Sequence, residues 1–369
     1  MKILVTGSKG FVGKNLVLEL KNSGYEEIYE YDIDTPKEKL DEYTKNCEFI
    51  FHLAGVNRPK DPNDFMKGNY GFTLELLEKL KKNHNKSPIL LTSSIQAELD
   101  NPYGKSKKAG EELLFQYSKE NNTDVYIYRL PNLFGKWSKP NYNSVVSTFC
   151  YNIARDLDIK INNPEAEITL CYIDDVIKEF KRALAGNPTR KGDYCYVPIT
   201  HKITVGELAE TIKSFKETRK TLEVPNMKDP LIKKLYSTYL SYLPEDKFSY
   251  ELKMNIDNRG SFTEFIKTLD RGQVSINISK PGITKGNHWH HTKNEKFLVV
   301  YGKGIIRFRK IDSKEVIEYN VSGDKLEVVD IPPGYTHNIQ NIGDTDMVTV
   351  MWANEPFDPD NPDTHYLEV

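Results

Sequence analysis

Short runs of β-branched and aromatic residues alternate with amphipathic stretches through the first half of the chain. The runs with the length and composition of strands are residues 2–6, 27–32, 48–53, 88–93 and 125–130. Apolar positions with helical spacing lie at 11–22, 70–83, 105–120, 144–156 and 204–218. This alternation of strand and helix predicts a doubly wound α/β fold built on a parallel sheet.

The pattern changes after about Tyr250, where Gly and Pro become frequent and strand-like runs follow one another directly. These runs are 273–279, 296–301, 304–310, 316–321, 325–331 and 346–352. They predict an all-β barrel or sandwich. The Tyr- and Leu-rich stretch 230–244 is interpreted as a helix packed between domains, with a lipid or partner site as the alternative. We therefore predict two domains, residues 1–244 and 245–369.

Composition narrows the class of protein. A chain of 369 residues suits two domains, and 38% hydrophobic with 28% charged residues is typical of a globular protein. The net charge of −2 gives no reason to expect nucleic acid or a membrane surface as partner. No signal-peptide pattern or membrane-length apolar run is present. Four scattered cysteines without a Cys-x-x-Cys pair lead us to expect a reducing, cytoplasmic compartment: Cys47, Cys150, Cys171 and Cys195.

A glycine-rich loop joins the first predicted strand to the first predicted helix. It reads Gly7-Ser8-Lys9-Gly10-Phe11-Val12-Gly13 and has G-x-x-G-x-x-G spacing. Glycines permit a tight turn and a close approach of backbone to a pyrophosphate, and the helix N-terminus presents free N–H groups to the anion. The loop therefore predicts a Rossmann-type dinucleotide site, although in isolation such a motif is also an ordinary glycine turn.

Asp32 ends the second predicted strand, 19 residues after Gly13. An acidic group at this place accepts hydrogen bonds from the adenine ribose and repels a 2′-phosphate. The alternative is a turn residue at the end of a strand, and the sequence leaves both interpretations open. Lys37 and Lys39 are the basic residues nearby.

Ser94, Tyr103 and Lys107 form a second constellation after the fourth predicted strand. Tyr and Lys four residues apart share one face of a helix. A phenol is a poor acid near neutral pH, and a nearby ammonium is expected to draw its pKa downward. The serine hydroxyl then holds the substrate oxygen beside the phenol, so the trio predicts a carbonyl reductase.

This part of the chain resembles the extended short-chain dehydrogenases/reductases that act on nucleotide sugars. The matching segments are 6–13, 52–55, Asn69, 92–94, 103–107, 129–135 and 172–176. The resemblance implies that Ser94, Tyr103 and Lys107 are catalytic and that Asn69 supports the helix bearing the lysine. It also implies coenzyme contacts from Gly7, Gly10, Phe11, Val12, Gly13, Asp32, Leu53, Ala54, Gly55, Tyr103 and Lys107. Sugar-nucleotide contacts are implied for Arg129, Asn132, Asn141 and Asn143.

A third constellation lies in the all-β half. His288 and His290 are two residues apart on a predicted strand and point to one face, Glu295 follows on the next strand, and His337 comes from a later run. Three imidazoles and one carboxylate suit a divalent ion such as zinc, nickel, manganese or iron. A lone His-x-His is more often surface polarity, but both halves together predict a metal site. His291 is expected to point to the opposite face and not to bind metal.

These two stretches resemble the two cupin motifs, with Gly323 displaced from the position that usually opens the second. The resemblance implies a double-stranded β-helix, or jelly roll. Residues 257–264 also resemble the Asp-x-Arg-Gly-x-Phe stretch of cupin-type keto-sugar epimerases.

The two halves in this order resemble the CapF family of bacterial capsule synthesis, including segments 140–145 and 286–300. The resemblance implies a homodimer with a zinc-bound cupin that epimerises a UDP-2-acetamido-2,6-dideoxy-4-hexulose at carbon 3. The reductase domain would then use NADPH at carbon 4, giving UDP-2-acetamido-2,6-dideoxy-L-talose on the path to UDP-N-acetyl-L-fucosamine. NADH is also expected, given Asp32. The alternatives are a 4-epimerase or dehydratase with a sensing cupin, which would retain NAD, and a non-enzymatic binding protein, which the intact Ser94, Tyr103 and Lys107 oppose.

Overall fold

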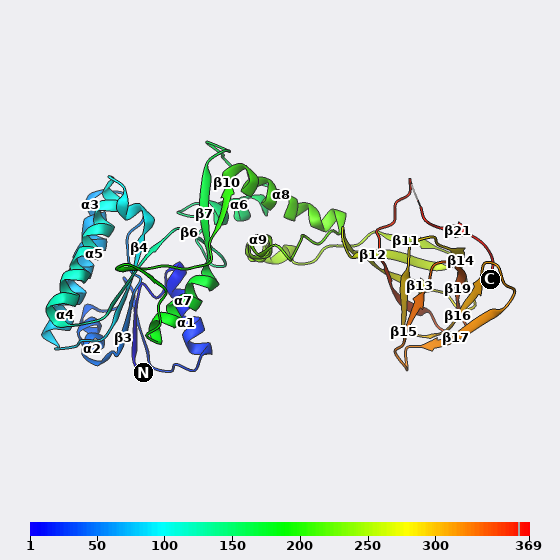
Figure 1. The fold of residues 1–369 in the computed structure, drawn as a ribbon, viewed down its shortest axis with the longest axis horizontal. Coiled ribbons are helices and arrows are strands. Elements are labelled where there is room, and N and C mark those ends of the chain that lie inside the picture. Colours follow the sequence, from blue (N-terminus) through cyan, green and yellow to red (C-terminus); the bar gives the residue numbers. More distant parts are fainter. Residues whose placement is uncertain (361) are drawn as a thin grey trace. The chain divides into compact units, whose positions relative to one another are not determined.

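The computed structural model describes residues 1–360 and 362–369 and divides into two units (Figure 1). The first unit comprises residues 1–213 and 229–244, and the second comprises 214–228 and 245–369. This division differs from the boundary expected at 244, because residues 214–228 group with the second unit. The Val224 amide donates to the Lys267 carbonyl at 2.8 Å, and the Lys267 amide donates to the Leu222 carbonyl at 2.8 Å.

A seven-stranded sheet forms the centre of the first unit, in the order β2-β1-β3-β4-β5-β9-β8. Its strands are β1 (Ile3–Thr6), β2 (Ile28–Tyr31), β3 (Phe49–His52), β4 (Ile89–Ser94), β5 (Val125–Leu130), β8 (Arg190–Lys191) and β9 (Tyr194–Cys195). All pairs are parallel except β8 with β9. Every residue of β4 is buried, which explains its unbroken apolar start and its lack of alternation. The predicted Rossmann-type parallel sheet is confirmed.

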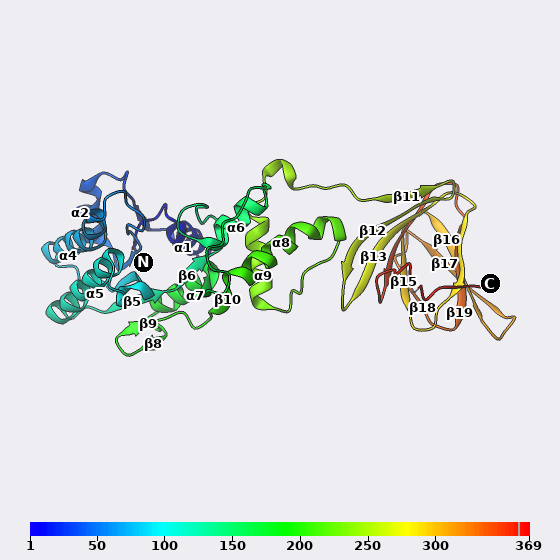
Figure 2. The same ribbon diagram turned by 90° about the horizontal axis from the view of Figure 1, so that it is seen from above.

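Helices cover both faces of this sheet (Figure 2). Leu16 and Phe180 belong to an apolar cluster on one face, beneath α1 (Phe11–Asn22) and α7 (Ile173–Leu184). The opposite face is covered by α2 (Lys37–Asn46), α4 (Phe72–Lys82) and α5 (Pro102–Asn121). Shorter helical segments are α3 (Asn63–Phe65), a π-helical turn η1 (Met66–Gly71) and the 3₁₀ turns η2 (Ile95–Glu98) and η3 (Glu245–Lys247).

A smaller three-stranded sheet, in the order β10-β7-β6, adjoins the carboxyl-terminal part of the first unit. Its strands are β6 (Asn132–Phe134), β7 (Glu167–Tyr172) and β10 (His201–Thr204). The accompanying helices are α6 (Val145–Ile153), α8 (Val205–Thr221) and α9 (Pro230–Leu240). The predicted helix at 230–244 thus ends earlier and belongs to the first unit, where Tyr242 donates through its hydroxyl to the Ser138 carbonyl.

Two antiparallel sheets build the second unit. The first contains β11 (Met254–Asp257), β12 (Gly260–Thr268), β13 (Gly272–Ser279), β20 (Met347–Ala353), β15 (Glu295–Tyr301) and β18 (Val328–Ile331) in that order. The second contains β17 (Val316–Ser322), β16 (Lys303–Lys310), β19 (Tyr335–Asn341), β14 (Thr284–Trp289) and β21 (His365–Tyr366). Phe297, Ile306, Phe308 and Ile339 pack between them as a common core. The all-β prediction is confirmed.

Among the helices that the structure describes, none is both long enough and apolar enough to cross a bilayer.

Candidate active site and candidate metal centre

The glycine-rich loop lies at the carboxyl end of β1, as its sequence predicts. Gly7 has φ +69°, and a Cβ atom there would lie 2.7 Å from the Ala54 nitrogen. A Cβ atom on Gly13 would lie 2.1 Å from the Gly7 carbonyl oxygen. The loop therefore requires glycine at both positions. Gly10 is the N-cap of α1 and provides no side-chain cap, so the helix N-terminus keeps its N–H groups for an anion.

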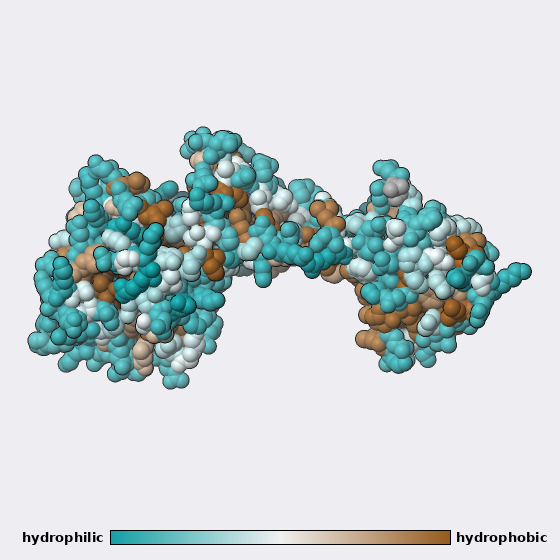
Figure 3. All heavy atoms as spheres, viewed as in Figure 1, coloured by the Kyte–Doolittle hydropathy of each residue, from teal (hydrophilic) through white to brown (hydrophobic). Residues whose placement is uncertain are grey.

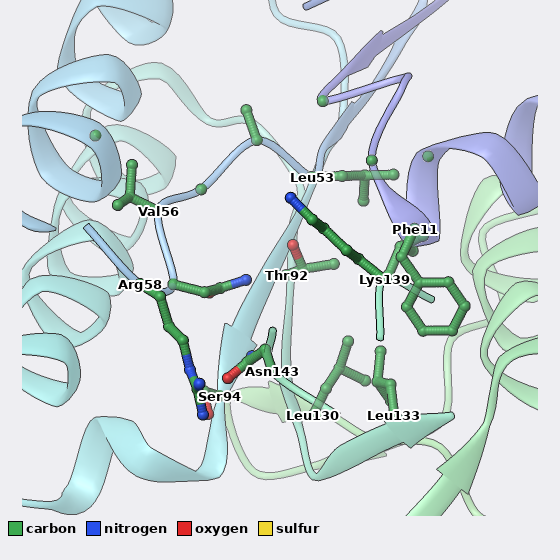
Figure 4. Close-up of a pocket in the computed structure, with 18 of the residues that line it drawn as sticks. Phe11, Leu53, Val56, Arg58, Thr92, Ser94, Leu130, Leu133, Lys139 and Asn143 are labelled. Carbon is green, nitrogen blue, oxygen red and sulfur yellow. The ribbon is translucent and has the colours of Figure 1, made fainter. Parts of the chain in front are cut away.

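A cavity of about 1200 Å³ extends from this loop to the end of β4 and the start of α5 (Figure 4). This is the edge of an α/β sheet where ligands bind. The residues that the sequence assigned to coenzyme or catalysis all line it: Gly7, Gly10, Phe11, Val12, Gly13, Asp32, Leu53, Ala54, Gly55, Ser94, Tyr103 and Lys107. Ser94 ends β4, while Tyr103 and Lys107 occupy the first turns of α5.

Lys107 is a buried residue of the cavity lining. Its ammonium donates to the Thr92 carbonyl at 3.2 Å and lies 5.9 Å from the centre of the Tyr103 ring. Burial lowers the pKa of Lys107 to about 8. Burial also raises the pKa of the Tyr103 phenol, which outweighs the opposite effect of its hydrogen bond with Ser94. The expected lowering of the phenol pKa by the lysine is therefore not seen in the protein alone, because desolvation disfavours the phenolate.

Asn69 lies in η1 and ties the cavity wall to α5. Its side-chain oxygen accepts from the Val56 amide at 2.8 Å, and its amide donates to the Val56 carbonyl at 3.0 Å and to Ser106 Oγ at 2.9 Å. Ser106 Oγ donates in turn to the Tyr103 carbonyl at 2.7 Å. These contacts connect Asn69 to the helix that carries Tyr103 and Lys107.

Asp32 braces the glycine-rich loop. Its carboxylate accepts the Lys9 amide at 2.7 Å and the Ile33 amide at 2.8 Å. The Lys9 side chain forms an ion pair with Asp34. The carboxylate still lines the cavity, so it fixes the loop and also presents negative charge to a coenzyme.

The four residues expected to contact the sugar nucleotide separate into two groups. Asn132 and Asn143 line the cavity, but Arg129 and Asn141 do not. The Arg129 guanidinium donates to both carboxylate oxygens of the buried Glu111 at distances from 2.6 to 3.2 Å. It also pairs with Glu98 at 2.8 Å. Arg129 therefore stabilises the fold here, because its donors are directed at carboxylates outside the cavity.

The histidine cluster of the second unit brings together residues from β14, β15 and β19 and from the turn after β14. One ligand atom from each of His288, His290, Glu295 and His337 lies within 4.8 Å of the others. Nε2 of His290 and Nε2 of His337 each lie 3.4 Å from Oε2 of Glu295. These three atoms are buried without a hydrogen-bond partner in the described part of the chain. Buried nitrogen and oxygen atoms that converge without hydrogen-bond partners fit the donor set of a metal ion.

The charge states in this cluster suit a cation. Burial lowers the pKa of His288 to about 4, so its imidazole is neutral near pH 7. Burial alone would raise the pKa of Glu295, but the His290 and His337 rings, whose Nε2 atoms lie 3.4 Å from its carboxylate, hold that pKa well below its ordinary value. The neutral His288 imidazole and the Glu295 carboxylate fit a divalent ion. His291 lies elsewhere, with its ring 4.5 Å from Trp289 and 4.7 Å from His365.

Known proteins match both units of the chain. The family model described as NAD dependent epimerase/dehydratase family matches residues 3–194, and that of the polysaccharide biosynthesis C-terminal domain matches residues 255–365. The UDP-2-acetamido-2,6-beta-L-arabino-hexul-4-ose reductase of Pseudomonas aeruginosa is 48% identical over 369 residues, which are 100% of this chain and 99% of that protein. The crystal structure of capsular polysaccharide assembling protein CapF from Staphylococcus aureus is 58% identical, covers 100% of both chains and has a TM-score of 0.95. The chain belongs to the CapF family.

A more distant structure supports only the fold. The UDP-glucose 4-epimerase of Thermotoga maritima is 23% identical, covers 66% of this chain and 98% of its own, and has a TM-score of 0.53. Membership of the CapF family therefore rests on the closer relatives, which span both units.

In this CapF-family chain, sequence reasoning missed two cations in the cavity. Arg58 and Lys139 both line it, from two separate loops, and Figure 4 shows the Arg58 side chain near Ser94. Neither forms an ion pair among the described residues. Arg58 follows Gly55 by three residues, so its nearness to that glycine is the signal that could have found it.

Sequence reasoning also missed His52, a buried histidine at the end of β3. Its ring nitrogens lie 2.8 Å from Thr6 Oγ1 and 2.9 Å from Thr73 Oγ1. Thr73 Oγ1 donates to the Asn69 carbonyl at 2.6 Å. Burial, reinforced by the Lys107 charge, lowers the pKa of His52 to about 3. This neutral imidazole therefore connects the strand before the glycine-rich loop to the Asn69 network.

Proposed function

We propose that the first unit reduces the 4-keto group of a UDP-linked 2-acetamido-2,6-dideoxy sugar with a nicotinamide coenzyme, in capsule or O-antigen synthesis. The observation that carries this proposal is the single cavity that holds the glycine-rich loop together with Ser94, Tyr103 and Lys107. The Pseudomonas aeruginosa relative is named as a reductase of such a UDP-hexulose, and the Staphylococcus aureus relative is named as a capsular polysaccharide assembling protein.

Each catalytic group has a defined task in this proposal. The coenzyme, when bound, supplies the hydride for carbon 4. Tyr103 donates a proton to the carbonyl oxygen as negative charge develops there. Ser94 holds that oxygen, and the Lys107 ammonium favours the phenolate that remains. Asn132 and Asn143 on the cavity wall are proposed to contact the sugar nucleotide. Arg58 and Lys139, which form no ion pair with a described residue, suit its diphosphate.

The proposal assigns epimerisation at carbon 3 to the second unit. His288, His290, Glu295 and His337 would hold a divalent ion, with zinc as the expected metal. Such an ion supplies a Lewis acid where negative charge develops after proton loss. The cluster opens into a cavity of about 430 Å³, which is lined by Lys285, Lys293 and Phe357 among others and is large enough for a sugar. The combined product would be UDP-2-acetamido-2,6-dideoxy-L-talose, on the path to UDP-N-acetyl-L-fucosamine.

The coenzyme proposed is NADPH, as the CapF resemblance implies, with NADH also accepted. The Asp32 carboxylate opposes a 2′-phosphate, and Lys37, which also lines the cavity, is the cation that would compensate it.

A homodimer is proposed for the whole chain. Figure 3 shows hydrophobic side chains gathered on one face of the second unit, over β15 and β17. The exposed residues there include Val300, Val316, Ile317 and Tyr319. β17 is an edge strand whose backbone is paired on one side only, so a second copy would cover both the apolar face and the edge. A cytoplasmic location is proposed as well, since all four cysteines are free and buried.

Product identification tests the reductase. The protein is incubated with NADPH and candidate UDP-4-keto sugars, and the products are identified by NMR and mass spectrometry. We expect a reduced UDP sugar with stoichiometric coenzyme oxidation. Tyr103→Phe should lower the rate at least a hundredfold with an unchanged fold, because the proton donor is lost. Near-normal NADPH oxidation by this variant would refute the assignment of Tyr103.

A further inference from the structure

The last residues of the chain form a strap beside the metal-ligand cluster. We use the name C-terminal strap for residues 363–368. The Leu367 amide donates to the Asn287 carbonyl at 3.0 Å, and the Leu367 carbonyl accepts from Thr336 Oγ1. Within the strap, β21 pairs with β14, so that Tyr366 lies opposite the ligand His288. The strap therefore contacts the strands that carry His288 and His337.

Asp363 anchors the strap to the turn between two metal ligands. Its carboxylate accepts three consecutive backbone amides, those of His291, Thr292 and Lys293, at 2.7 to 2.8 Å. It also accepts Thr292 Oγ1 at 3.1 Å. These amides occupy the turn that joins His290 to Glu295, and successive N–H groups of this kind bind an anion. The Asp363 carboxylate thus accepts the hydrogen bonds that these amides would otherwise donate to water, and it fixes the conformation of the turn.

The Asp363 backbone carbonyl acts directly on one ligand. It lies 2.5 Å from Nδ1 of His290, whose ring is almost completely buried. A carbonyl only accepts, so Nδ1 carries the hydrogen, and the lone pair of the neutral ring is on Nε2. Nε2 is the nitrogen that lies 3.4 Å from Glu295 Oε2. The carbonyl therefore fixes both the tautomer and the ring orientation that metal binding requires.

The neighbouring strap residue contacts the cavity as well. Thr364 Oγ1 accepts from the Lys293 ammonium at 3.0 Å, and both residues line the cavity of the second unit. One short segment therefore fixes the turn, a ligand ring and a cationic side chain of the cavity wall.

We propose that Asp363 is a positioning residue of the metal centre and that the C-terminal strap sets the metal affinity of the second unit. The proposal rests on the metal site proposed above. The Asp363 carboxylate holds the 291–293 turn, which positions His290 and Glu295. The Asp363 carbonyl orients the His290 ring. Asp363 itself is not one of the four residues whose ligand atoms converge, because its carboxylate accepts the turn amides and its carbonyl meets Nδ1 of His290.

The test measures metal affinity directly. Metal-stripped protein is titrated with zinc against a chromogenic chelator, for the wild type, Asp363→Asn, Asp363→Ala and His290→Ala. Asp360→Asn is the matched control, because the Asp360 carboxylate forms no hydrogen bond or ion pair with any residue that the structure describes, and only its backbone amide donates, to Asp358. We expect the dissociation constant to rise roughly 10- to 100-fold for Asp363→Ala and less for Asp363→Asn, which keeps one acceptor oxygen. The control should match the wild type.

Two further measurements separate positioning from general stability. The visible spectrum of cobalt-loaded Asp363→Asn should differ from that of the wild type, because a moved imidazole changes the coordination geometry. A purely structural role would instead lower the melting temperature of metal-free protein while leaving zinc affinity and the cobalt spectrum unchanged, and that result would overturn the proposal. Wild type that fails to bind one zinc ion with higher affinity than His290→Ala would refute the metal site itself. Should Asp363→Ala not fold, Asp363→Asn decides.

Discussion

A single lysine illustrates how chemistry and stability oppose each other at the residue scale. Lys107 is nearly inaccessible, and burial lowers its pKa from 10.5 to about 8. The folded state therefore disfavours the protonated form. This cost is fully present below about pH 8 and is relieved as the pH rises toward 10.5, so the contribution of Lys107 to the free energy of unfolding increases with pH across that window.

Lys107→Met should therefore abolish reduction but stabilise the metal-free, coenzyme-free protein at pH 7. The pKa difference corresponds to roughly 3 kcal/mol, and the lost hydrogen bond to Thr92 offsets about 1 kcal/mol. We expect a gain of about 1–2 kcal/mol in urea unfolding that shrinks at pH 10. If Lys107→Met were less stable than the wild type at pH 7, interactions in the folded protein would more than offset the free-energy cost of burying the Lys107 ammonium.

Gly55 is a second position at which a small change in a side chain should affect catalysis. A Cβ atom there would lie 2.9 Å from Lys107 Nζ and 2.9 Å from Asn69 Oδ1. Gly55→Ala should displace the lysine and lower kcat roughly 10- to 100-fold with little change in melting temperature. Gly71→Ala is the control, since its Cβ atom would make only an ordinary 3.8 Å contact with the Met66 carbonyl. Equal activities of the two variants would argue against a catalytic position for the ammonium.

At the scale of elements, the end of β2 and the glycine-rich loop act as one structure. The Asp32 carboxylate accepts the Lys9 and Ile33 amides, so the group that we propose for the adenine ribose also fixes the loop. From the sequence, Asp32 could be a ribose-binding residue or a turn residue at the end of a strand. In the structure it holds the loop through hydrogen bonds, and its carboxylate still lines the cavity.

Asp32→Asn should shift coenzyme preference toward NADPH by about tenfold in the ratio of kcat/KM values, because a negative charge near the 2′-phosphate is removed. Both coenzymes should bind more weakly in absolute terms, since one of the two loop hydrogen bonds loses its acceptor. The measurement is steady-state kinetics with each coenzyme, with Asp34→Asn as the control for a general charge change. An unchanged ratio would mean that Asp32 serves only the loop.

At the scale of the whole molecule, the two proposed reactions have an obligatory order. The proton on carbon 3 is acidic only while carbon 4 is a ketone, so epimerisation must precede reduction. Each cavity is lined by residues of its own unit, which is consistent with an intermediate released by one site and taken up by the other.

Deuterium labelling tests this order. In deuterated water, Tyr103→Phe should still exchange deuterium into carbon 3 of the keto sugar, while His290→Ala should lose that exchange because the metal set is incomplete. Wild-type product without deuterium at carbon 3 would exclude epimerisation by exchange with solvent. Exchange that survives loss of the metal would show instead that a side chain alone stabilises the carbanion.

Much of this protein follows from sequence because the relevant geometry is local. Strand and helix periods predicted the parallel sheet and the all-β unit, and the glycine-rich loop, Tyr103 with Lys107, and His288 with His290 each lie within one turn or one short run. The convergence of His337 and Glu295 on that pair was predicted from cupin-like motifs and is present in the structure.

Only the tertiary structure decided the features that depend on long-range packing. Arg129 was expected at the substrate but is directed to Glu111, because a buried carboxylate on α5 attracts its guanidinium. The Tyr103 pKa rises where a lysine neighbour alone suggested a fall, because burial is a property of the folded chain. Asp363 reaches His290 across 73 residues of sequence. No local period encodes such a contact, since it exists only once the sheets have packed and brought the C-terminal strap against β14.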